Sequence, residues 1–206
     1  MCSDNLLSFV FPNSVLTNPF QCLSRSILAP TIAQIFDYNR RLLARLPGTD
    51  RTYLAADFIK ESEDQSTVPP TALLDYLSLH PPPGLPPPTL TLKTSAMCQM
   101  LRNFSVDRGL VKNTWVVITH LGAHLIAVKN LLEDGVTTDD ILLPRITFTA
   151  MLPSGHTLLR KQFPLAVKYA TTFNSCQGLT LDQIGTDLTR PVLLNGQLYT
   201  VLSRVR

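Results

Sequence analysis

The proline-rich run HPPPGLPPP, residues 80–88, constrains the fold of this chain more than any other segment. Six of its nine residues are proline. Because proline fixes its own φ angle and has no amide hydrogen to donate, such a run fits neither a helix nor a central strand. We interpret it as a stiff connector, with docking of a partner on a polyproline helix as the alternative.

The residues before this connector have the pattern of an α/β fold. The apolar run SILAPT, residues 26–31, predicts a buried strand that ends at a proline. Apolar side chains near helical spacing predict a helix over residues 32–46. A second strand is predicted over residues 51–59, after the turn sequence PGTD. A strand, a helix and a strand in this order are the unit of an open α/β sheet.

The residues after the connector change to short β-rich segments. Five of them follow one another at roughly even spacing: TLTLK, AMCQMLRN, TWVVITHL, HLIAVKNLL and ILLPRITFTAM. Gly122 lies between the third and the fourth, where a hairpin needs a turn. This spacing is typical of a small β-barrel.

The α/β pattern returns at the segment FPLAVKYATTF, residues 163–173. We therefore expect the barrel to be inserted into one α/β domain. The predicted organisation places the first part of that domain in residues 1–84, the barrel in residues 85–150 and the second part in residues 151–206.

The charges are distributed unevenly along the chain. Residues 145–206 carry seven basic side chains and two carboxylates, whereas residues 1–144 carry eleven basic and thirteen acidic ones. A basic final third favours an anionic partner, either nucleic acid or nucleotide phosphate. A solvated basic face is the alternative that charge alone leaves open.

The cysteines and the N-terminal residues suggest an intracellular protein. Four scattered cysteines share no metal-ligand spacing with each other or with the histidines, so we expect free thiols and no metal site. The apolar run LLSFVFPNSVL is interrupted by Pro12 and has no basic residue before it, so we expect no signal peptide.

A polar turn follows the last apolar strand segment, in the sequence TTFNSCQG, residues 171–178. Gly178 allows the backbone to turn or to approach a ligand closely. Turns at the carboxyl ends of strands in open α/β sheets bind ligands, and backbone amides there hold phosphate oxygens. A cysteine hydrolase with Cys176 as nucleophile is the alternative, although no histidine has a recognisable companion motif.

The chain ends in the sequence LSRVR, and it contains no Gly-Lys pair and no phosphate loop. An arginine in such a position is either an exposed cation or a group that reaches a transferring phosphoryl group. We expect this chain alone to be unable to hold and hydrolyse ATP.

Seven segments in order resemble the C-terminal half of the PIF-type DNA helicases, a superfamily-one family that includes the helicase region of Helitron transposons. The segments are LSRSILAPT, RLPGTDRTYLAAD, GLPPPTLTLK, MLRNFSVDRGL, LLPRITFT, the stretch from Arg160 to Val192, and NGQLYTVLSRVR. The resemblance implies a second RecA-like α/β domain that is interrupted by a small SH3-like barrel.

The resemblance also implies a role for several residues. Gln177 and Gly178 match a helicase motif that couples nucleotide to DNA, and Arg204 matches the catalytic arginine that reaches the ATP γ-phosphate. These three are the implied nucleotide-binding residues, with Arg204 catalytic. The implied DNA-binding residues are Pro30, Thr31, Thr172, Asn174 and Ser175.

The resemblance implies that the complete enzyme uses ATP and Mg²⁺ and acts on single-stranded or forked DNA. It also implies a location in the nucleus or in mitochondria and a role in DNA repair, recombination or telomere maintenance. The first RecA-like domain is absent from this sequence. In addition, Ser175 and Cys176 replace a Lys-Ser pair that is usual in the family.

Two alternatives to a helicase part remain open at this point. One is a non-catalytic module that binds single-stranded DNA, with Phe104, Trp115 or Phe148 stacking on bases. The other is an inert, transposon-derived remnant.

Overall fold

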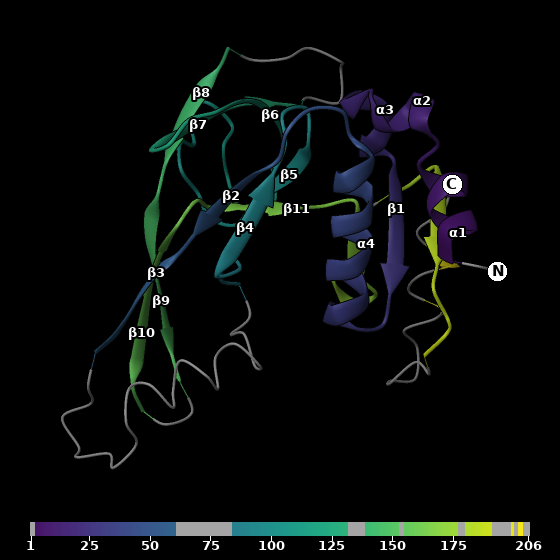
Figure 1. Cartoon of the computed structure of the whole chain (residues 1–206). Coiled ribbons are helices and arrows are strands. Elements are labelled where there is room, and N and C mark those ends of the chain that lie inside the picture. The colour runs from purple at the N-terminus through teal and green to yellow at the C-terminus, as the bar shows by residue number, and fades with distance from the viewer. Residues whose placement is uncertain are drawn as a thin grey trace.

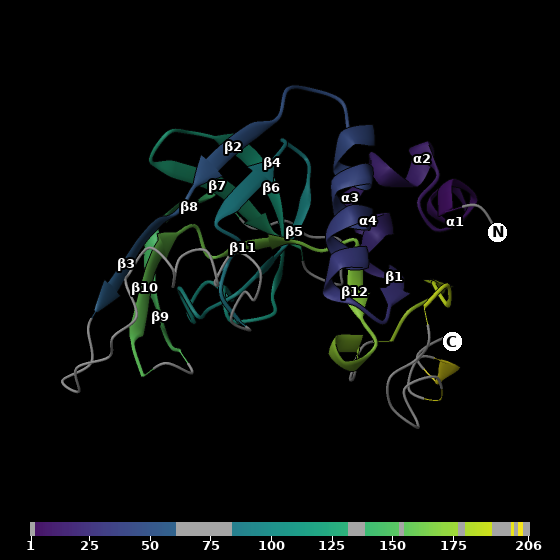
Figure 2. The same cartoon turned by 60° about the horizontal axis from the view of Figure 1, so that its bottom comes forward.

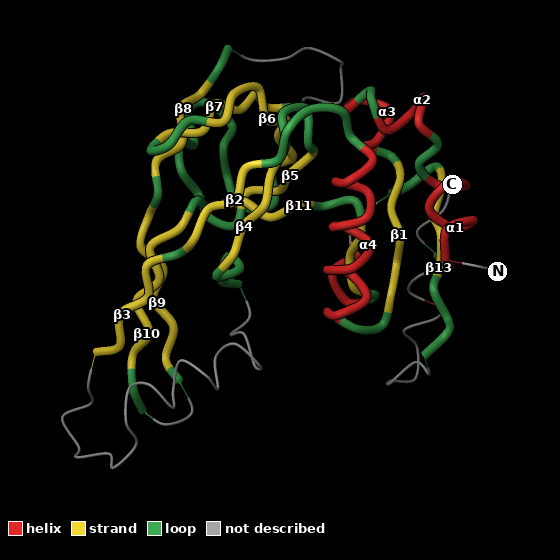
Figure 3. Tube along the Cα trace, viewed as in Figure 1, coloured by secondary structure: helices red, strands yellow, loops and turns green. Residues whose placement is uncertain are grey.

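The computed structural model describes residues 3–60, 84–131, 139–152, 155–176, 180–190, 199, 202 and 203. These residues form a parallel sheet with helices, an antiparallel β-region beside it, and a three-stranded arm that extends away from both (Figures 1 and 3). The protein is therefore mixed α/β with several separate sheets.

Three short helices open the chain: α1 (Ser3–Val10), α2 (Asn13–Leu16) and α3 (Pro19–Leu23). Leu7, Val10 and Phe11 lie three and four positions apart, which places them on one face of α1 and the residue after it. Leu7, Val10 and Phe11 are fully buried. Gly185 of the neighbouring strand lies so close to α1 that an added Cβ atom would stand 2.6 Å from the Val10 side chain.

The parallel sheet has the strand order β12 (Ala170–Thr172), β1 (Arg25–Ala29) and β13 (Gln183–Thr186). The strand predicted over residues 26–31 is thus confirmed, as is the helix after it, α4 (Ile32–Arg45). Helix α4 packs on β1 and β12. The buried Asn39 Oδ1 of α4 accepts hydrogen bonds of 2.9 Å from the backbone amides of Tyr169 and Ala170.

The antiparallel region consists of a five-stranded sheet and a two-stranded ribbon. The sheet has the order β11 (Leu165–Val167), β5 (Met97–Met100), β6 (Trp115–Leu121), β7 (Leu125–Asn130) and β8 (Ile141–Pro144). The ribbon pairs β2 (Arg51–Leu54) with β4 (Thr89–Leu92). Gly122 lies in the turn between β6 and β7, as predicted.

The three-stranded arm has the order β3 (Ala56–Lys60), β10 (Thr157–Gln162) and β9 (Ile146–Met151). Arg160 is 2% exposed, and its guanidinium donates hydrogen bonds of 2.8 and 2.6 Å to the two carboxylate oxygens of Asp57. A third bond, of 3.0 Å, goes to the Pro86 carbonyl. These contacts fix β10 against β3 and against the residues that precede β4.

Strand pairing crosses the limits of residues 85–150. β2 pairs with β4, β10 with β9, and β11 with β5. The single strand predicted over residues 51–59 is in fact two strands, because residues 51–54 pair with β4 whereas residues 56–60 pair with β10.

No helix among the described residues is both long enough and apolar enough to cross a lipid bilayer. Cys22, Cys98 and Cys176 are buried.

Candidate functional site

The carboxyl ends of the three parallel strands bring the predicted DNA-binding residues to one edge of the sheet. Ala29 of β1 lies opposite Thr172 of β12, and Leu28 lies opposite Thr186 of β13. Pro30 and Thr31 directly follow β1, whereas Asn174 and Ser175 come after Phe173, the residue that follows β12. We call this rim the carboxyl edge, and define it by residues 30–31, 172–175 and 187–190. Gln177, Gly178 and Arg204 lie outside the described residues.

Thr31 caps the N-terminus of α4. Its Oγ1 accepts a hydrogen bond of 3.3 Å from the Gln34 amide and donates one of 2.7 Å to Gln34 Oε1. Threonine is a preferred cap because its hydroxyl satisfies an otherwise unpaired amide of the first turn. The remaining amides of this turn and the helix dipole make the start of α4 suited to a negatively charged ligand.

A tight turn follows β12 and includes the short 3₁₀ helix η1 (Asn174–Cys176). Thr172 Oγ1 donates a hydrogen bond of 2.8 Å to Ser175 Oγ and accepts one of 3.2 Å from the Ser175 amide. Asn174 and Ser175 are exposed to solvent. Hydroxyl and amide groups therefore face solvent beside Pro30 and Thr31, and such groups hold phosphate oxygens.

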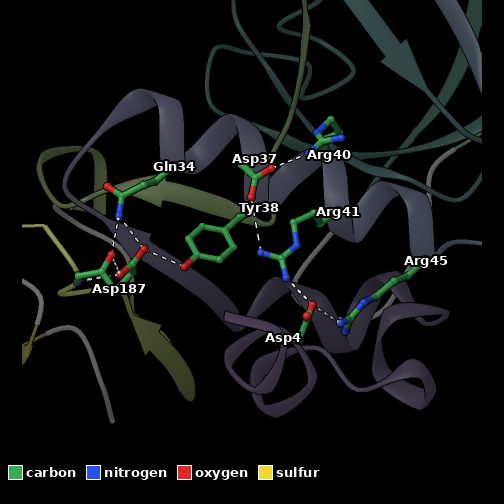
Figure 4. Close-up of polar contacts among 9 residues, drawn as sticks. Asp4, Gln34, Asp37, Tyr38, Arg40, Arg41, Arg45 and Asp187 are labelled. Carbon is green, nitrogen blue, oxygen red and sulfur yellow. Dashed lines mark hydrogen bonds and ion pairs between the residues drawn. The ribbon is translucent and has the colours of Figure 1, made fainter. Parts of the chain in front are cut away.

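Asp187 organises the third part of the edge, and the sequence analysis did not identify it (Figure 4). It directly follows β13 and is 6% exposed. Its Oδ2 accepts hydrogen bonds of 2.7 Å from Gln34 Nε2 and 2.8 Å from the Tyr38 hydroxyl. Its Oδ1 accepts hydrogen bonds of 2.9 Å from the Thr189 amide and 2.7 Å from the Thr189 hydroxyl.

These four donors decide the charge state of Asp187. Burial alone would raise its pKa, but the hydrogen bonds from Thr189, Tyr38 and Gln34 outweigh burial and hold the pKa of Asp187 below its usual value. Burial and the bond to this carboxylate raise the pKa of Tyr38. Asp187 is therefore a charged acceptor at neutral pH, while Tyr38 stays a donor.

A cavity of about 600 Å³ lies beside this network, between α4 and the residues after β13. Its lining includes Asp187 and Arg190 on one side, and Arg41 of α4 on the other. Arg41 is ion-paired with Asp4 of α1 and lies 3.5 Å from Asp37 (Figure 4). Arg190 is exposed, so a cation stands at the rim of the cavity.

Lys168 is a second residue that the sequence analysis missed. Its Nζ donates a hydrogen bond of 2.8 Å to Thr171 Oγ1, just before the turn after β12. Burial lowers the pKa of Lys168 to about 8, and the neighbouring Cys176 opposes this shift in part. A lysine within the apolar run FPLAVKYA was the one sequence signal that could have drawn attention to it.

No group of three or more histidine, cysteine or acidic side chains suited to a metal ion occurs within the described part of the chain.

The relatives and the solved structures that resemble this chain are DNA helicases of one type. No family model matches the chain. The human ATP-dependent DNA helicase PIF1 is 32% identical over 171 residues, which cover 82% of this chain and 24% of the human protein. The zebrafish (Danio rerio) protein of the same name is 29% identical over 174 residues, again with 24% of its length covered. The chain thus spans about a quarter of the length of these curated relatives.

Solved structures resemble nearly the whole chain in fold. The crystal structure of Pif1 helicase from Candida albicans aligns with a TM-score of 0.68 at 22% identity, covering 98% of this chain and 50% of that one. The Pif1 helicase from Bacteroides in complex with ADP-AlF3 and ssDNA aligns with a TM-score of 0.59 at 22% identity, covering 100% and 44%.

Proposed function

This chain belongs to the family of PIF1-type DNA helicases, and we propose that it forms the second motor domain of such an enzyme. In this proposal the parallel sheet is RecA-like, and its carboxyl edge contacts the backbone of a single DNA strand. Unwinding of DNA then requires a first RecA-like domain with a phosphate loop, which closes on this one when ATP binds.

The domain boundaries follow from the same proposal. Residues 85–150 form the inserted SH3-like barrel, and residues 1–84 and 151–206 form the two parts of the RecA-like domain. The antiparallel sheet β11-β5-β6-β7-β8 supports a barrel at this place. β2, β10 and β11 then connect the RecA-like domain with the barrel, because they pair with β4, β9 and β5.

The register between β1 and β12 is the observation that carries the proposed DNA contact. Because Ala29 lies opposite Thr172, the start of α4 and the turn at Ser175 are adjacent on one rim. Phosphate contacts in nucleic-acid complexes come from hydroxyl groups, backbone amides and helix N-termini of this kind. These contacts carry no base information, which suits a protein that moves along DNA.

A binding experiment with the 206-residue chain tests this contact. The variant Thr31→Ser/Thr172→Val keeps a capping hydroxyl on α4 but removes one methyl group and one hydroxyl from the edge. We expect its affinity for a labelled oligo(dT), measured by fluorescence anisotropy at low salt, to fall several-fold, since one contact to a phosphate is worth on the order of 1 kcal/mol.

The variant Thr52→Val is the matched control. Thr52 is an exposed threonine of β2 whose hydroxyl lies 3.0 Å from that of Thr91. Its affinity should equal that of the wild-type chain. Equal affinity of the edge variant and this control would contradict the proposed contact.

In this proposal nucleotide is bound by the complete enzyme. ATP and Mg²⁺ would be held mainly by the first domain, with Gln177, Gly178 and Arg204 completing the site from this chain. A guanidinium at the γ-phosphate stabilises charge that develops during phosphoryl transfer, which is worth roughly 10³–10⁵ in rate.

The test of the arginine needs a protein that also carries a phosphate loop. There, Arg204→Ala is expected to abolish ATP turnover while the affinity for nucleotide stays nearly unchanged. Turnover retained in a single-cycle assay would contradict the assignment of Arg204. We place such an enzyme in the nucleus or in mitochondria, where its DNA substrates are.

A further inference from the structure

The outer surface of the three-stranded arm carries a pattern that the carboxyl edge does not explain. Phe58 of β3 is 63% exposed although it lies in the middle of a strand. Its cross-strand neighbours are Leu159 of β10 and, beyond it, Thr149 of β9. Because side chains alternate between the two faces of a sheet, these three residues share one face.

Lysines flank Phe58 on this face in both directions along the strands. Lys60 lies two residues further along β3, in the row that also holds Thr157 and Met151. Lys161 lies in the row on the other side, opposite Ala56 and Thr147. Two residues along a strand correspond to about 7 Å, so each lysine row is about that far from the aromatic row.

The nine residues of these three rows, which we call the arm face, include two cations and no carboxylate. The acid of this sheet, Asp57, alternates to the opposite face and is paired there with Arg160. Phe148, one of the aromatic residues predicted to stack on bases, also lies on the opposite face and is 2% exposed. The arm face therefore offers one exposed aromatic ring between two positive charges.

The positive charge continues beyond the edge of the arm. A cavity of about 500 Å³ lies beside β9 and is lined by Thr149, Phe148, Arg102 and Lys112 among others, with no carboxylate among its lining residues. The Arg102 guanidinium stands 5.0 Å from the centre of the Phe148 ring and donates a hydrogen bond of 3.2 Å to the Thr147 carbonyl. Arg102, which follows β5, is thus held against β9, the strand that contributes Thr149 to the arm face.

We propose that the arm face is a second binding site for single-stranded nucleic acid, with Phe58 stacking on a base and Lys60 and Lys161 contacting the phosphates on either side. Exposed aromatic rings within a basic surface are the common means of holding a single strand without sequence preference. The nucleic acid would continue from the arm face past Thr149 toward Arg102 and Lys112. The arm is well separated from α4 and the parallel sheet in both views (Figures 1 and 2), so this site is distinct from the carboxyl edge.

The inference rests on the proposed function only for the class of ligand. Its most direct test is the variant Phe58→Trp, titrated with oligo(dT) while indole fluorescence is recorded. Stacking of a base on the indole is expected to quench the fluorescence in proportion to binding. The control is Leu142→Trp, because Leu142 lies in β8, outside the arm, and is 55% exposed. Its fluorescence is expected to stay unchanged.

Two further variants measure the energetic role. Phe58→Ala is expected to weaken binding about tenfold, the lower part of the range for one stacked base. Lys60→Gln/Lys161→Gln is expected to make the dependence of log affinity on log salt shallower by about 1.4, since each phosphate contact to a single strand contributes about 0.7. Lys129→Gln, in β7, is the control for the lysines.

The outcomes separate this inference from the proposed function. If anisotropy shows binding but the Phe58→Trp fluorescence and the lysine variants do not respond, the arm site is wrong, and the edge variant then decides the proposed function alone. If the arm variants weaken binding and Thr31→Ser/Thr172→Val does not, the arm site stands without the edge contact. Absence of binding at low salt overturns both. Sedimentation that shows self-association lost on Phe58→Ala would assign the face to a second copy and would also overturn the inference.

Discussion

Gln34 Nε2 donates a hydrogen bond of 2.7 Å to Asp187 Oδ2 and joins the start of α4 to the end of β13. The Oε1 atom of the same side chain accepts a hydrogen bond from the Thr31 hydroxyl. One amide group therefore connects a predicted DNA-contacting residue with the residues that lead toward the C-terminal motif. A displacement of either element must break or stretch this connection.

The first prediction concerns the acceptor of this network. Asp187→Ala leaves the buried Tyr38 hydroxyl and the Gln34 amide without their acceptor, so we expect the free energy of unfolding to fall by about 2 kcal/mol. Urea denaturation of the purified chain measures it. Asp140→Ala is the control, because Asp140 is exposed and lies 3.9 Å from Lys129, and its loss should change stability by less than about 0.5 kcal/mol. Similar losses in the two variants would contradict the importance of the network.

The second prediction concerns the pH dependence that Lys168 causes. Its pKa is about 8 in the folded chain, against an ordinary value of 10.5. Between these values the unfolded chain binds more protons, so the contribution of this lysine to stability rises with pH in that window. Below pH 8 the buried charge is present and disfavours folding.

Lys168→Met removes this contribution. We expect the variant to be more stable than the wild-type chain at pH 7, by on the order of 2 kcal/mol, and the difference to shrink by pH 10. Urea denaturation at the two pH values measures the change, with Lys129→Met as control, because Lys129 is a partly exposed lysine of β7. A difference that is the same at both pH values would show that burial does not shift this amine.

The third prediction concerns the ion pair within the arm. Arg160→Ala removes the partner of the mostly buried Asp57 carboxylate, and we expect a loss of about 3–5 kcal/mol in the free energy of unfolding. The neighbouring Lys161→Ala, on the exposed face, should cost less than about 0.5 kcal/mol.

A double variant tests the reason for this loss. In Arg160→Met/Asp57→Leu no charge remains unpaired, so most of the lost stability should return. If the double variant is no more stable than Arg160→Ala, the cost comes from packing and not from the isolated carboxylate.

The fourth prediction concerns the contact between α1 and β13. In Gly185→Ala the new methyl group would lie 2.7 Å from Leu6 Cδ1 and 2.6 Å from Val10 Cγ2, so α1 must move away from the strand. We expect a loss of about 1–3 kcal/mol, measured by thermal unfolding. In the double variant Gly185→Ala/Val10→Ala, the loss of stability should be smaller than the sum of the losses in the two single variants, because the smaller side chain at position 10 makes room. Strict additivity would contradict a direct clash.

The sequence predicted the local features of the fold well. The strand at β1, the helix α4 and the turn at Gly122 each depend on apolar spacing and turn residues within a few positions, and each is confirmed. The pairing of β3 with β10 joins residues about a hundred positions apart. Nothing in the local pattern specifies that pairing, since it depends on how the whole chain folds back.

The same distinction holds at the carboxyl edge. Thr31, Thr172 and Ser175 came from motifs that are contiguous in the sequence, and the fold does bring them to one rim. Asp187 was missed because its partners Gln34 and Tyr38 lie on a helix near the other end of the chain. An aspartate before a loop has no sequence signature of its own until the topology places that helix beside it.

The short connection between β11 and β12 has a mechanical consequence. β11 ends at Val167 in the antiparallel sheet and β12 begins at Ala170 in the parallel one. Between them, Tyr169 bonds through its hydroxyl to the Met97 amide at 3.0 Å and through its own amide to Asn39. A linker of two residues that is anchored on both sides leaves no room for a hinge. A rotation of the antiparallel region relative to the parallel sheet would therefore have to break the bonds of Tyr169 to Met97 and Asn39.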